Sequence, residues 1–141
     1  MTINWSKSLI FDEGIEGEYL INDRVIKITY FNGDGVHEKI QEKIEKVVIG
    51  CLQSENKIIA EIGSFYVNLY NEYWTNEFIE EEYKSLSIDK FISLVTIDSF
   101  DYYGLDETLN IYFRIEDEVY FGRNFINAVV NDNLEISNCS I

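Results

Sequence analysis

The stretch from Lys57 to Trp74 places the strongest constraint on the fold of this 141-residue chain. Its apolar residues recur at the spacing of one face of an amphipathic helix. They are Ile58, Ile59, Ile62, Phe65, Tyr66, Leu69, Tyr70 and Tyr73. No proline interrupts the pattern. A helix with such a broad apolar face must be covered by a sheet or by another helix.

A second helical pattern runs from about Val36 to Gln53, with apolar residues on one side and charged residues on the other. Only two or three residues separate the two patterns, which predicts an antiparallel helical hairpin. Gly33-Asp34-Gly35 precedes the first helix but lacks the lysine and the glycine spacing of a phosphate-binding loop. We therefore interpret it as a capping turn.

Strand patterns flank the helices on both sides. Asn22-Asp23 suits the turn of a first hairpin, and the clearest alternation runs from Leu109 to Glu116. The predicted strands span residues 18–21, 25–31, 94–103, 109–116, 119–130 with an interruption near Gly122 (119–121 and 125–130), and 134–139, and 2–12 is irregular or strand-like. Short helical pieces are predicted at 77–84 and 88–91, the latter capped by Ser87.

This order of elements predicts one α+β domain over residues 1–141. The short strand connections predict an antiparallel sheet of about five or six strands, in the order ββ-αα-βββ. The helical hairpin would pack on one face of that sheet.

The net charge of −15 restricts the partners of the chain. Binding to nucleic acid or to an anionic membrane needs clustered Lys and Arg, so both are disfavoured. Residues 72–118 carry 13 acidic and 3 basic side chains, whereas residues 1–71 carry 11 and 7. If this segment is contiguous in space, it forms a negative face that suits a basic protein.

Aromatic residues between acids mark the most interesting part of that segment. Phe100 and Tyr102 lie beside Asp98 and Asp101, and an exposed aromatic in a negative field is typical of a protein-binding hot spot. The predicted partner-binding residues are Glu77, Glu80, Glu81, Asp98, Asp101, Tyr102, Asp106 and Glu107.

Few residues suggest chemistry, and we predict no catalytic residue, metal or cofactor. His37 is the single histidine, too few for a multi-His metal site, and no acidic cluster has the spacing of a calcium loop. Cys51 fits a buried thiol on an apolar helix face, and Cys139 is expected to be more exposed. With no signal peptide and no long apolar run, a cytoplasmic location is expected.

Several short motifs resemble a family of small bacterial domains of unknown function. They are Asn71-x-x-Trp74 at a helix end, Ser87 to Phe91, Leu94-Val95-Thr96-Ile97, Leu109 to Phe113, and Tyr120-Phe121-Gly122. Where the family has Gly-His, this chain has Gly122-Arg123. Members of that family often occur as immunity proteins beside secreted or contact-dependent toxins.

The resemblance implies an immunity protein that binds and neutralises a cognate toxin domain without chemistry of its own. Two alternatives stay open. One is a regulatory module that binds a small molecule or peptide in a pocket between helices and sheet. The other is an enzyme based on two carboxylates close together in a cleft.

Overall fold

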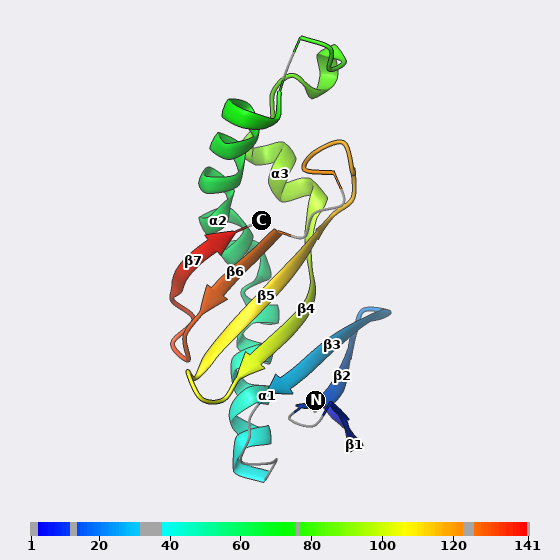
Figure 1. The fold of residues 1–141 in the computed structure, drawn as a ribbon, viewed down its shortest axis with the longest axis vertical. Coiled ribbons are helices and arrows are strands. Elements are labelled where there is room, and N and C mark those ends of the chain that lie inside the picture. Colours follow the sequence, from blue (N-terminus) through cyan, green and yellow to red (C-terminus); the bar gives the residue numbers. More distant parts are fainter. Residues whose placement is uncertain (1–2, 12–13, 32–37, 76, 123–125, 141) are drawn as a thin grey trace.

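The computed structural model describes residues 3–11, 14–31, 38–75, 77–122 and 126–140. Figure 1 shows a seven-stranded sheet in the order β1-β2-β3-β4-β5-β6-β7, with helices packed on one face. The strands are β1 Asn4–Phe11, β2 Gly14–Ile21, β3 Arg24–Phe31, β4 Val95–Tyr103, β5 Thr108–Ile115, β6 Ile126–Val130 and β7 Ile136–Ser140. The helices are α1 Glu38–Gln53, α2 Glu55–Leu69 and α3 Ile88–Leu94, so the predicted α+β class is confirmed.

The sheet is mixed and has seven strands, which corrects the prediction of a wholly antiparallel sheet of about five or six strands. β3 and β4 pair in parallel, from Lys27 opposite Ser99 to Phe31 opposite Tyr103. The other neighbouring strands are antiparallel, as their short connections require. Between β3 and β4 the chain passes through all three helices, and this long connection returns it to the same end of the sheet.

The two long helices lie on one face of the sheet as predicted, but they follow one another along it instead of folding back (Figure 1). Lys43 in α1 reaches Glu107 beyond the end of β4, whereas Tyr70 after α2 packs on Tyr120 beyond the end of β5. Only Ser54 separates the helices, and its carbonyl still accepts a hydrogen bond from the Ile58 amide at 3.0 Å. A single residue is too short to reverse the chain direction.

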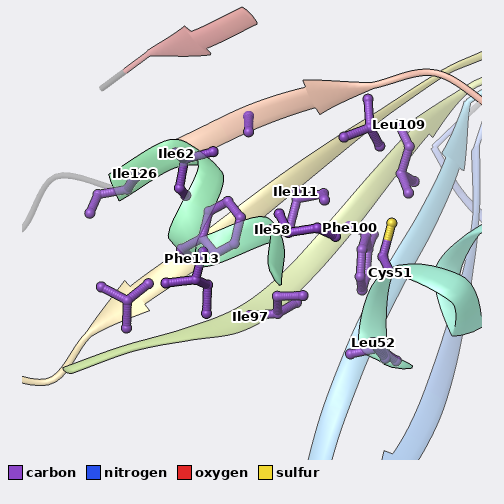
Figure 2. Close-up of a cluster of buried hydrophobic side chains, with 14 of the residues drawn as sticks. Cys51, Leu52, Ile58, Ile62, Ile97, Phe100, Leu109, Ile111, Phe113 and Ile126 are labelled. Carbon is purple, nitrogen blue, oxygen red and sulfur yellow. The ribbon is translucent and has the colours of Figure 1, made fainter. Parts of the chain in front are cut away.

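The core lies between α1, α2 and the central strands. Figure 2 shows Cys51, Ile58 and Ile62 facing Phe100 and Ile111 of the sheet. Each of these side chains is at most 3% exposed, and burying one of this size contributes roughly 1.5–3 kcal/mol. The predicted apolar face of α2 is therefore confirmed, except that Phe65 and Tyr73 are exposed.

Local turns agree with the sequence where side chains determine them. Asn22 and Asp23 have φ of 46° and 64°, the left-handed pair needed for a tight hairpin. The Ser87 hydroxyl accepts a hydrogen bond from the Lys90 amide at 3.1 Å and caps α3.

Two predicted local features differ from the structure. The predicted helical piece 77–84 shortens to a 3₁₀ turn at Glu81–Tyr83, and the predicted strand 119–121 is a turn. The predicted capping turn 33–35, His37 and Arg123 lie outside the described residues.

Candidate functional site

The predicted partner-binding residues do not share one surface. Glu77, Glu80 and Glu81 lie in the segment after α2, at one end of the long axis of the molecule (Figure 1). Asp106 and Glu107 lie in the β4–β5 turn toward the other end (Figure 1). The separation arises because β4 carries the chain away from its start for nine residues before the turn.

The segment after α2 is an arm, residues 72–86, that projects beyond the sheet (Figure 1). Its two ends are joined at a neck by the Asn71 side chain. The Asn71 amide nitrogen donates to the Leu86 carbonyl at 3.0 Å, and the Asn71 oxygen accepts from the Leu86 amide at 2.8 Å. The Tyr70 hydroxyl also donates to the Tyr83 carbonyl, at 2.6 Å. The neck thus fixes where the arm leaves the body.

Aromatic rings form the base of the arm. The Tyr70 ring lies edge-on to Tyr120 and Phe121, with centroids 5.1 and 5.5 Å apart. Trp74 packs on Phe121 at 5.5 Å, and Tyr83 packs on Tyr120 at 5.3 Å. Such contacts add to the stabilisation that comes from burial. The packed aromatic rings therefore anchor the base of the arm to the body of the protein.

Acidic side chains crowd the arm and the adjoining loop, which together we call the acidic end, residues 72–86 and 116–118. Its acids are Glu72, Glu77, Glu80, Glu81, Glu82, Glu116, Asp117 and Glu118. Its single basic residue, Lys84, pairs with Glu81 at 3.1 Å. The loop joins the arm because Asp117 accepts a hydrogen bond from the Tyr83 hydroxyl at 2.9 Å, and this bond is the main cause that raises the Tyr83 pKa to about 12.

Sequence reasoning missed Glu72, Glu82 and the acids at 116–118. The acids at 116–118 could have been placed from the β4–β5 hairpin. Because β4 and β5 are antiparallel, residues just before β4 and just after β5 lie at the same end of the sheet. The Glu116 amide confirms this proximity by donating to the Leu94 carbonyl at 3.0 Å.

Two large aromatic side chains of the arm are directed to solvent. Phe78 is 88% exposed and Tyr73 is 75% exposed. Tyrosine is enriched among the residues that dominate protein interfaces, and a neighbouring exposed phenylalanine adds apolar area that a partner can cover. The acidic end therefore combines a strong negative charge with apolar contact area.

The opposite end of the molecule uses its acids internally. Lys43 of α1 contacts Glu107 at 2.9 Å and Asp132 at 3.0 Å. The Tyr102 hydroxyl donates to Asp132 at 3.4 Å, but the Tyr102 side chain is only 1% exposed. The expectation of an exposed hot spot at Phe100 and Tyr102 is therefore wrong, because both side chains point to the helix side of β4.

Asp98 and Asp101 lie on the outer face of the sheet, away from the helices. They line one groove with a volume of about 450 Å³, together with Val25, Lys27, Thr29, Ser99, Phe100 and Arg114. Arg114 pairs with Asp98 at 2.9 Å. Asp101 accepts a hydrogen bond from the Tyr112 side chain, and burial raises the Asp101 pKa.

Comparison with family models, with curated proteins and with solved structures gave no match for this chain. Within the described ranges, no helix has the length and apolar character needed to cross a membrane. In the same part of the chain, no three His, Cys, Asp or Glu side chains gather as metal ligands.

Proposed function

We propose that this protein binds a basic protein partner through the acidic end, as an immunity protein binds and neutralises a toxin domain. The observation that supports this proposal is the combination of eight acidic side chains with exposed Tyr73 and Phe78 on an arm held at its neck. The protein performs no chemistry in this role. It acts by covering a functional surface of its partner.

Charge and aromatic area have separate parts in this mechanism. The negative field of the acidic end attracts a basic partner and raises the association rate, which reaches about 10⁸–10⁹ M⁻¹s⁻¹ in strongly steered complexes at low salt. Phe78 and Tyr73 then bury apolar surface in the contact and slow dissociation. A pre-positioned arm reduces the ordering cost of binding.

The proposal narrows the contact predicted from the sequence. Glu77, Glu80 and Glu81 lie inside the acidic end. Asp106 and Glu107 lie toward the other end of the molecule, and Tyr102 is buried (Figure 1). Asp98 and Asp101 line the groove on the outer face of the sheet and lie outside the acidic end.

The test first asks whether the reading frame directly upstream encodes a basic domain, and then measures binding to that domain. The arm variant carries Glu80→Lys and Glu81→Lys. The matched control carries Asp106→Lys and Glu135→Lys, which reverses two exposed charges in the turns at the other end. We expect the arm variant to slow association by about tenfold or more at low salt, with little change in the control.

A third variant separates the two parts of the mechanism. Phe78→Ala is expected to speed dissociation while leaving the association rate nearly unchanged. Circular dichroism and thermal unfolding establish that each variant is folded. The proposal is contradicted if the arm and control variants slow association equally, or if neither variant changes binding.

A further inference from the structure

The two edges of the sheet differ in how well they are protected against pairing with a further strand. The outermost strands are β1 and β7. The sequence of β1 contains Lys7, and its pairing with β2 shifts register twice, and natural proteins use both features to block an edge. β7, Ile136-Ser137-Asn138-Cys139-Ser140, has no charged residue and no proline. Its one register shift lies at its start, and Asn138 to Ser140 pair regularly with β6. Among the described strands, β7 therefore offers the less protected edge.

Helix α2 lies directly over this edge of the sheet. The Tyr66 hydroxyl of α2 contacts the carbonyl oxygens of Asn127 in β6 and Ser140 in β7, at 2.6 and 2.5 Å. The Tyr66 side chain is fully buried between the helix and these two strands. The position of α2 relative to β7 is therefore fixed at the end of the strand.

The flank of α2 beside the β7 edge carries exposed apolar surface. On the other flank, Gly63 faces the Phe91 side chain of α3. Phe65 is two residues from Gly63, which places it on the opposite side of the helix from α3. Because α3 leads into β4, that opposite side is the one toward β7 (Figure 1). Phe65 is 45% exposed, and Leu69, one turn further along, is partly buried.

We propose that this edge pairs with the same edge of a second copy of the chain. The two β7 strands run antiparallel, and Phe65 of each copy covers the joined strands. Main-chain groups point alternately to the two sides of a strand, so β7 presents donors and acceptors along its open edge. Antiparallel pairing of a strand with its own copy obeys a two-fold axis, the commonest symmetry of protein dimers. The pairing does not depend on the proposed function of the acidic end.

The distribution of charge favours a second copy over a basic protein at this edge. β7 has no charge that would attract such a protein, whereas the acidic end has many. A two-fold axis perpendicular to the sheet turns the second copy through half a turn, so the two arms point in opposite directions (Figure 1). This arrangement separates the most acidic parts of two chains that each carry a net charge of −15.

Analytical ultracentrifugation of the full chain tests the association. We expect a reversible monomer–dimer equilibrium with a Kd below about 0.1 mM. Raising the ionic strength from about 0.01 to 0.15 M shortens the Debye length from about 30 to 8 Å and should strengthen the dimer by screening repulsion. Binding of a basic partner to the acidic end should weaken over the same range. The two proposals can therefore fail separately.

Amide hydrogen exchange locates the contact. Residues 136–140 should exchange more slowly in the dimer than in the dilute monomer, because their outward amides gain partners. The amides of the arm should exchange at the same rate in both states.

Two pairs of variants test the edge and the flank of α2. Asn138→Glu adds a charge to an exposed position of β7 in both copies and should weaken the dimer by about tenfold or more. Asn56→Glu adds the same charge on the other side of α2 and should have little effect. Phe65→Ala should weaken the dimer by about fivefold, whereas Tyr73→Ala, at an exposed aromatic of the arm, should not.

Thermal unfolding establishes that each variant is folded. A chain that stays monomeric across these concentrations and salt conditions overturns the proposal. So does a dimer that tolerates Asn138→Glu as well as it tolerates Asn56→Glu, or one in which exchange at 136–140 is unchanged.

Discussion

The acidic end and the β4–β5 turn are built from the same residue types but use them in opposite ways. At the turn, Glu107 and Asp132 converge on Lys43, which ties α1 to two turns of the sheet. At the acidic end, the sequence places eight acids beside one basic residue, Lys84, which contacts Glu81. Both Glu107 and the arm acids come from the acidic segment 72–118.

The difference shows that charge counting identifies a segment but not a surface. The acids at 72–82 and 116–118 meet because the β4–β5 hairpin begins and ends at the same side of the sheet. The acids within and beyond β4 are carried elsewhere, to the groove and to the Lys43 site. The topology of the sheet therefore determines which acids form ion pairs within the chain and which face solvent.

The largest expected effect comes from Phe121→Ala at the base of the arm. Phe121 is fully buried and contacts the rings of Tyr66, Tyr70 and Trp74, so we expect a loss of about 3–5 kcal/mol in unfolding free energy. Denaturant unfolding gives the size of the loss. Amide hydrogen exchange should show added opening of the arm.

Phe100→Ala is the matched control for that prediction. Phe100 is equally buried but packs beneath α1 and α2, so its loss should be of similar size without a selective effect on the arm. Equal exchange rates of the arm in the two variants would show that Phe121 does not hold it.

A smaller effect is expected at the neck. Asn71→Ala leaves the Leu86 amide and carbonyl without their side-chain partner, at a cost of about 1–3 kcal/mol. Asn71→Asp keeps the acceptor for the Leu86 amide but sets a carboxylate oxygen against the Leu86 carbonyl and adds charge to the acidic end, so it should be destabilised as well. The two variants are compared by unfolding free energy and by exchange of the amides at 77–86. An unchanged arm in Asn71→Ala means that the aromatic base alone positions it.

The sequence was sufficient for features that depend on neighbouring residues. Periodicity located the apolar face of α2, and side-chain chemistry located the Asn22-Asp23 turn and the Ser87 cap. The parallel β3–β4 pair was not predictable in this way, because it depends on where a connection of three helices returns the chain. The continuous path of α1 and α2 depends on hydrogen bonding through Ser54, which a loop-length argument overlooks.

The candidate site was only partly predictable for the same reason. Composition indicated acids near Glu80, but the contribution of Asp117 needed the β5 end to be placed beside Tyr83. Tyr102 was misjudged because alternation along β4 does not say which face the helices cover. The groove was not predicted at all, since the Asp98 bulge becomes visible only when β4 is paired with β5.

Alkaline pH should weaken the acidic end through Tyr83. The Asp117 hydrogen bond, followed by burial, raises the Tyr83 pKa from its ordinary value near 10 to about 12 in the folded protein. Because the folded state holds this proton more tightly, the associated stability is complete below about pH 10 and is lost as pH rises toward 12.

The Asp117→Asn variant tests that linkage. It should lower the Tyr83 pKa, followed by its ring signals in an NMR titration, and should reduce the fall in stability between pH 10 and 12. Tyr83→Phe removes the titrating group and serves as the control. An unchanged Tyr83 pKa in Asp117→Asn would mean that Asp117 does not join the loop to the arm in solution.

The smallest effects sharpen the comparison most directly, because one substitution is made at both ends. Glu107→Gln removes a charge that Lys43 contacts at 2.9 Å, and a loss of about 0.2–1 kcal/mol is expected for such an exposed ion pair. Glu82→Gln removes one of several neighbouring acids and should slightly increase stability by relieving repulsion. High salt should shrink both changes. If the two changes in unfolding free energy have opposite signs at low salt, the turn neutralises its acids within the fold, while the acidic end keeps its charge for a partner. Changes of equal sign would remove that distinction.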